Sequence, residues 1–195
     1  MSLACFGTSR DIGMRPWLVL LTVPAWLSAA PARAADIKTI DCVVARLDPV
    51  AVATMRSGQR DIVEKRPVRQ IDSARAALDA ATGQCGKENR WSDAAVDIAY
   101  DFTFATIVLP VIEDAMRADG NDPQRAERAF QTLTVEQRGE FSRDGGDVAP
   151  ALKILNAALE KEGISLKTDR QQHEVGLFAS TMSAIDHDRR IFPTL

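Results

Sequence analysis

Residues 100–112 read YDFTFATIVLPVI, and whether this stretch is a helix or a strand decides the fold class. Its aromatic and β-branched side chains favour a strand locally. It is also apolar on nearly every side, which is typical of a helix buried at the centre of a bundle. Both flanks read as helices, and no other stretch offers a partner strand. We therefore predict one buried helix over 92–118, kinked or broken at Leu109 by Pro110.

The rest of the chain is rich in signals that begin a helix. Two expected starts place Asp before Pro at the first helical position, and two have the spacing of a capping box. These signals are Asp48-Pro49, Asp122-Pro123, Thr134 with Gln137 and Thr168 with Gln171. Glycines supply the expected stops. The helices are expected over about 37–47, 49–66, 67–82, 92–118, 123–133, 135–143, 148–162 and 169–190. This pattern predicts an all-α, single-domain bundle of about seven helices.

The N-terminus has the three parts of a secretory signal peptide. Arg15 precedes an uncharged apolar run, PWLVLLTVPAWLSAA, over residues 16–30. The run has 15 residues, fewer than the roughly 20 that a membrane-spanning helix needs. Ala32-Arg33-Ala34 then supplies the small-x-small pattern of a cleavage site. We therefore expect residues 1–35 to be a cleaved signal peptide.

Cleavage is expected near Ala34 or Ala35, which leaves residues 36–195 as the mature helical domain. Met14 lies directly before Arg15 and the apolar run, and it would make a more ordinary start than Met1. We therefore expect translation to begin at Met14. The mature domain is expected in the periplasm or outside the cell.

The number of cysteines in the mature chain agrees with export. After cleavage only Cys42 and Cys85 remain, and two cysteines in an exported protein most simply form one disulfide. They are 43 residues apart, and closing such a loop stabilises the fold by about 4 kcal/mol in the chain-entropy model. Cys85 lies in TGQCGKENRW, residues 82–91, which reads as an exposed polar turn. We predict that the disulfide fastens this turn to the first mature helix.

The same segment carries a second structural signal. Trp91 directly precedes Ser92, an expected N-cap, and Val96 follows at the spacing of a hydrophobic staple. The segment is therefore interpreted as a structural corner between two helices.

Composition excludes several classes of partner. Without residues 1–35 the chain loses three cationic side chains and one acidic side chain, so its net charge changes from −3 to −5. Both signs are scattered, with no basic block that would attract nucleic acid or an anionic membrane surface. The remaining 160 residues are enough for one domain with its own core. No second apolar run reads as long enough to span a bilayer, so we expect a soluble mature chain that does not cross the membrane.

The sequence contains no common catalytic or cofactor motif. It lacks a nucleophile elbow, a phosphate-binding loop, a His-Glu-x-x-His zinc motif and a Cys-x-x-Cys-His haem site, so we expect no cofactor. The candidate acids are Glu113 and Asp114, which follow Pro110 in the apolar segment. One of them, facing the interior with a raised pKa, could serve a small hydrolase as general acid. Adjacent residues diverge on a helix, so the two are not expected to act together.

A second alternative is a metal-binding sensor that uses Asp186, His187 and Asp188. Two carboxylates beside an imidazole could hold a metal ion, although the same residues also suit a polar helix end. The other histidine, His173, lies 14 residues away, about 21 Å along a helix, so one metal cannot bind both. The leading hypothesis is a non-enzymatic module that binds an unknown periplasmic protein, or a small apolar ligand between its helices.

Overall fold

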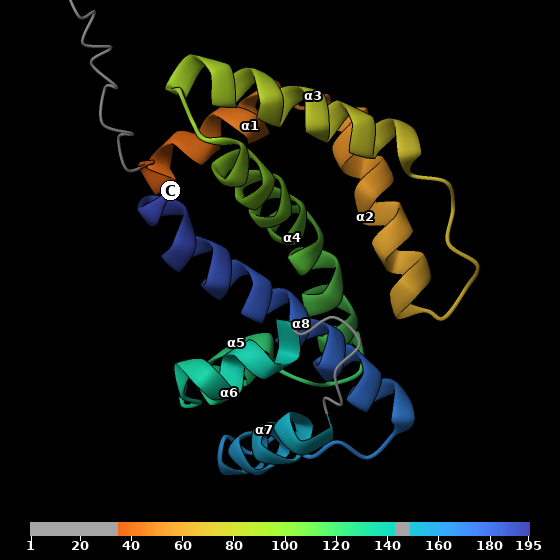
Figure 1. Ribbon diagram of the computed structural model, residues 1–195. Coiled ribbons are helices and arrows are strands. Elements are labelled where there is room, and N and C mark those ends of the chain that lie inside the picture. The colour runs from red at the N-terminus through yellow and green to blue at the C-terminus, as the bar shows by residue number, and fades with distance from the viewer. Residues whose placement is uncertain (1–34, 143–148) are drawn as a thin grey trace, which may run out of the picture. The chain divides into compact units, whose positions relative to one another are not determined.

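Figure 1 shows the computed structural model, which describes residues 35–142 and 149–195. The described residues form helices and no strands, which confirms the all-α prediction. The helices are α1 (Asp41–Arg46), α2 (Pro49–Val63), α3 (Asp72–Asn89), α4 (Asp93–Ala118), α5 (Pro123–Gln131), α6 (Val135–Gly139), α7 (Ala149–Lys161) and α8 (Asp169–Ile191). Three short 3-10 helices, η1 (Ile37–Ile40), η2 (Glu140–Ser142) and η3 (Phe192–Thr194), adjoin them. The described residues thus hold eight α-helices, in agreement with the expected bundle of about seven. The expected signal peptide, apart from Ala35, lies outside the described residues.

The capping signals give the helix starts. Asp48 accepts from the backbone of Val50 at the start of α2, and Asp122 accepts from Gln124 at the start of α5. Both expected capping boxes form completely, at the first turns of α6 and α8. The predicted starts are confirmed because each depends on contacts within one turn of the chain.

Helix α4 is the buried helix that the apolar stretch predicts. It runs without interruption through Pro110, so the expected break at Leu109 is wrong. The side chain of Pro110 lies on an exposed face. The ring therefore costs one backbone hydrogen bond but does not displace core side chains.

Two apolar clusters share α4. The first cluster contains Ile112 and Met116 of α4, with side chains from α5, α7 and α8. The second contains Ala95, Ala99 and Val108, with side chains from α1, α2 and α3. Since α4 supplies buried residues to both clusters, it is the central element of the described fold.

The expectation that no further run could span a bilayer needs correction. Helix α4 has 26 residues and contains an 18-residue window with a mean hydropathy of 1.6, so it is long and apolar enough to cross a membrane. A core helix of a soluble bundle passes the same test. The packing of α4 between two apolar clusters agrees with that second interpretation.

Helix α3 differs most from its expected bounds of 67–82. It starts at Asp72 and continues to Asn89, through Gly83 and Gly86. It stops at Arg90, which takes the left-handed conformation with φ of 58°. Cys85 therefore lies inside a helix and is fully buried, and the expected exposed turn is wrong.

Candidate functional site

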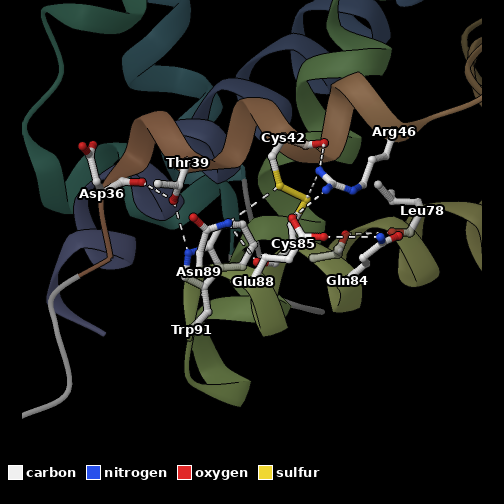
Figure 2. The surroundings of a disulfide bond; sticks show 11 residues. Asp36, Thr39, Cys42, Arg46, Leu78, Gln84, Cys85, Glu88, Asn89 and Trp91 are labelled. Carbon is white, nitrogen blue, oxygen red and sulfur yellow. Dashed lines mark hydrogen bonds and ion pairs between the residues drawn. A yellow bond between two sulfur atoms is a disulfide. The ribbon is translucent and has the colours of Figure 1, made fainter. Parts of the chain in front are cut away.

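The disulfide joins α1 to α3, as the cysteine count predicts. Cys42 and Cys85 are bonded, with their Cα atoms 6.2 Å apart. Figure 2 shows the bridge beside Arg46 and Asn89. A guanidinium nitrogen of Arg46 lies 3.3 Å from the Cys85 sulfur, and another pairs with Glu88 at 2.6 Å. Cys85 has no exposed surface and Cys42 is partly buried, so an attacking thiol can approach the bridge only from the Cys42 side.

The residues after Cys85 form the predicted corner. Ser92 caps α4, and the Trp91 ring packs edge-on against Phe192 with centroids 5.2 Å apart. The Trp91 indole nitrogen donates to the Thr39 hydroxyl at 3.2 Å, as Figure 2 shows. A Cβ atom on Gly86 would lie 2.6 Å from a methyl group of Val96. Gly86 is therefore needed for close packing of α3 on α4.

The candidate acids Glu113 and Asp114 lie on the solvent side of α4. The Asp114 side chain is 76% exposed and that of Glu113 is 27% exposed. Both pair with Arg117, at 2.6 Å for Asp114 and 3.1 Å for Glu113. The structure therefore gives neither residue the buried setting that a general acid with a raised pKa requires.

The candidate metal cluster does not converge on one point. Asp186 pairs with Arg138 at 3.1 Å and with Arg190 at 3.4 Å. His187 is exposed, whereas Asp188 is buried. Within the described residues no group of three or more His, Cys, Asp or Glu side chains is placed to hold a metal ion. Consecutive residues on a helix point about 100° apart, which separates the three.

Asp188 is unusual for another reason. It is 4% exposed, and its Oδ2 atom has no hydrogen-bond partner among the described residues. Burial, with a smaller contribution from the nearby charge of Asp101, raises the pKa of Asp188 from 3.8 to about 7. Acids with a strongly shifted pKa occur at functional sites and also at purely structural positions. No described groove is lined by Asp188.

An open groove of about 490 Å³ follows α2. Its apolar wall comes from the α1–α2 turn and the first half of α2, namely Leu47, Pro49, Val52 and Ala53. Arg56 and Arg60 line its other end. Val50, beside it in the chain, is 71% exposed. The groove thus combines apolar surface with two positive charges.

A smaller hollow of about 160 Å³ continues from Arg60. Arg60 lines both spaces, and the second lies between the end of α2 and the second half of α4. The α2 residues that line the two recur every three or four positions, so they occupy one face. Together they mark a stripe along α2 that we call the α2 groove.

Sequence reasoning missed the α2 groove. The available signal was Arg56 and Arg60 at i, i+4 beside an apolar stretch, a spacing at which like charges repel. That signal alone does not tell whether acidic side chains from other helices neutralise the pair. In the folded structure Glu64 and Asp114 line the smaller hollow with Arg60, but they pair with Arg66 and Arg117 instead of with Arg60.

The chain matches no protein-family model, no curated protein and no solved structure. The arguments for function therefore come from its own residues.

Proposed function

We propose that this protein is an exported, non-enzymatic binding module whose α2 groove takes an acidic, amphipathic helix of a partner protein. The observation that carries the proposal is the state of Arg56 and Arg60. Neither makes an ion pair with any described residue, whereas many arginines elsewhere in the fold do. The paired ones are Arg46, Arg66, Arg69, Arg117, Arg125, Arg128, Arg138, Arg170 and Arg190.

The Arg56 and Arg60 side chains differ in how they are held. Arg56 donates through Nε to the carbonyl of Ile107 at 3.2 Å, which ties its side chain to α4. The Arg60 side chain makes no hydrogen bond with a described residue and lies where the two hollows meet. Two like charges held four residues apart cost about 0.2–0.5 kcal/mol in an isolated helix. A carboxylate on a bound partner would offset that repulsion.

The size of the α2 groove favours a helical segment. From Pro49 to Val63 the lining face of α2 extends over 15 residues, a rise of about 21 Å. An open groove of this length suits an amphipathic helix of about 14 residues laid along it. A small apolar ligand, the other occupant expected from the sequence, is better held in an enclosed cavity without charges.

Export is the other half of the proposal, and it rests on the sequence of residues 1–35. The start of the described chain supports one of the two cleavage positions. Ala35 is buried in the second cluster, and Asp36 caps η1 through the Lys38 backbone at 3.0 Å. Cleavage after Ala34 keeps this buried alanine, whereas cleavage after Ala35 removes it.

A pair of labelled peptides tests the groove. Both are 15-residue amphipathic helices with the same apolar face, and the flanking positions are all Glu in one and all Lys in the other. We expect the Glu peptide to bind the mature protein at least about tenfold more tightly, measured by fluorescence anisotropy. Arg60→Glu should weaken the Glu peptide at least about tenfold.

Arg189→Glu is the matched control, because Arg189 is exposed, makes no ion pair with described residues and lies on α8. It makes the same charge change and should alter affinity less than about twofold. Equal binding of the two peptides, or equal losses in the two variants, would contradict the proposal. Binding of dodecanoate with no binding of either peptide would instead assign the groove to a small amphiphile.

A further inference from the structure

A separate polar pocket of about 450 Å³ lies where two helix-ending turns meet. One turn joins α4 to α5 and the other joins α7 to α8. Each bends at a glycine in the left-handed region, Gly120 with φ of 81° and Gly163 with φ of 76°. In each, the amide three residues past the helix bonds back into the last turn, from Asn121 to Met116 and from Ile164 to Leu159. Both walls are therefore fixed by Schellman-type turns.

Contacts between the two turns hold the pocket in shape. The Gln171 side chain donates to the Asp119 carbonyl at 3.0 Å. Arg170 pairs with the Asp119 carboxylate at 3.0 Å. These contacts join α8 to the end of α4, so the pocket exists before any ligand arrives.

The acidic groups at the pocket are already engaged. Asp119 pairs with Arg170, and Asp122 accepts from the Gln124 backbone at 2.9 Å as the N-cap of α5. The cations are not engaged to the same degree. The Lys167 side chain makes no hydrogen bond or ion pair with described residues, and the ion pair of Arg125 with Asp122 is long, at 3.7 Å, as is its contact with the Glu162 carbonyl, at 3.5 Å. The pocket therefore has unused positive charge.

A buried donor points to the same chemistry. Asn121 lines the pocket and is 7% exposed, and its Nδ2 group has no hydrogen-bond partner among the described residues. A buried donor without a partner is unfavourable, and an acceptor atom on a ligand would supply the missing hydrogen bond. The amide, Lys167, Arg125 and the Ser165 hydroxyl together offer donors and positive charge.

We propose that this pocket binds a small, doubly charged oxyanion, either a dicarboxylate or a phosphate. The oxygens sit between the Asn121 amide and the Lys167 ammonium, with Arg125 completing the charge balance. The site is independent of the α2 groove, so the two proposals succeed or fail separately.

Nuclear magnetic resonance tests the site on the mature protein with two probes, succinate and inorganic phosphate, at constant ionic strength. We expect saturable shifts of the Asn121 side-chain amide and of the Gly120 and Ser165 backbone amides, with a Kd below about 1 mM. Saturation by succinate alone identifies a dicarboxylate site, and saturation by phosphate alone a phosphate site. Shifts that stay linear with both probes up to about 50 mM overturn the proposal.

Two variants and a control make the test specific. Lys167→Gln and Asn121→Ala should each weaken the bound probe at least about fivefold. Lys153→Gln, an exposed lysine on α7, should not weaken it. Asn121→Ala removes a donor that lacks a partner, so its melting temperature should not fall. A lower melting temperature with unchanged affinity would mean a structural role for Asn121 and would overturn the assignment. If Asn121→Ala does not fold, the affinity of Lys167→Gln for the probe still tests the proposal.

Discussion

Single buried acids differ sharply in how their charge is compensated. Asp61 is 2% exposed and pairs with Arg66 at 3.0 Å and Arg69 at 3.1 Å, which fastens the loop after α2. Glu174 is fully buried and pairs with Arg170 through one oxygen only. Asp188 makes no ion pair with a described residue. Its charge is the least compensated, so its titration should have the largest effect on folding.

Replacing Asp188 by Asn should remove a pH dependence of stability. The folded-state pKa of about 7 exceeds the ordinary 3.8, so between these values the folded chain holds a proton that the unfolded chain has lost. Stability therefore falls as pH rises from about 4 to about 7. We expect the wild type to lose about 2–3 kcal/mol, relative to Asp188→Asn, between pH 5 and pH 8. Urea unfolding at the two pH values measures this.

Parallel pH profiles for the two proteins would show that Asp188 does not titrate in this range. His187→Gln is the control, because His187 is the exposed neighbour on the same helix. It should leave the difference between wild type and Asp188→Asn unchanged.

Two glycines in α3 make a matched pair for testing close packing. A Cβ on Gly86 would meet Val96 at 2.6 Å, whereas a Cβ on Gly83 would meet nothing within 4 Å. Alanine is favoured over glycine inside a helix by about 1 kcal/mol, but a clash in a packed interface costs about 1–3 kcal/mol. We expect Gly83→Ala to raise the melting temperature and Gly86→Ala to lower it. Equal shifts in both variants would refute the packing role of Gly86.

Whole helices show what the sequence could predict and what it could not. Starts with a side-chain N-cap, such as Ser92, were predictable because the cap acts within one turn, whereas the start of α3, which has no such cap, was expected at 67 and lies at Asp72. The end of α3 was not predictable, because Gly83 has the character of a helix stop, and only the packing of Gly86 on Val96 shows why the helix continues past it. The burial of Cys85 follows from that continuation. The α2 groove and the polar pocket could not be predicted for the same reason, because both are formed by side chains that lie far apart in the chain.

Pro110 gives a test at the level of one element. It lies inside α4 on an exposed face and leaves one helical hydrogen bond unmade. Pro110→Ala restores that bond without filling or emptying the core, so we expect the free energy of unfolding to rise by about 1 kcal/mol or more. Chemical denaturation measures the change. A lower stability would mean that the packing of α4 depends on the proline.

The molecule as a whole depends on the bridge between α1 and α3. The bridge closes a loop over a sequence separation of 43 residues and borders the second apolar cluster. Replacing Cys42 and Cys85 together by Ala should lower the free energy of unfolding by about 2–4 kcal/mol, because the unfolded chain regains freedom. Wild type treated with a reductant should approach the same value. A loss below about 0.5 kcal/mol would show that the helices hold this corner without the disulfide.

The central claim is an exported, disulfide-closed helical module, and one intact-mass measurement tests it most directly. The full chain is produced with its own N-terminus in a bacterial host, and the mature protein is weighed without reduction. We predict a chain that begins at Ala35 and weighs two hydrogen masses less than its reduced form. A chain that retains residues 1–34 and carries free thiols at Cys42 and Cys85 would contradict the claim.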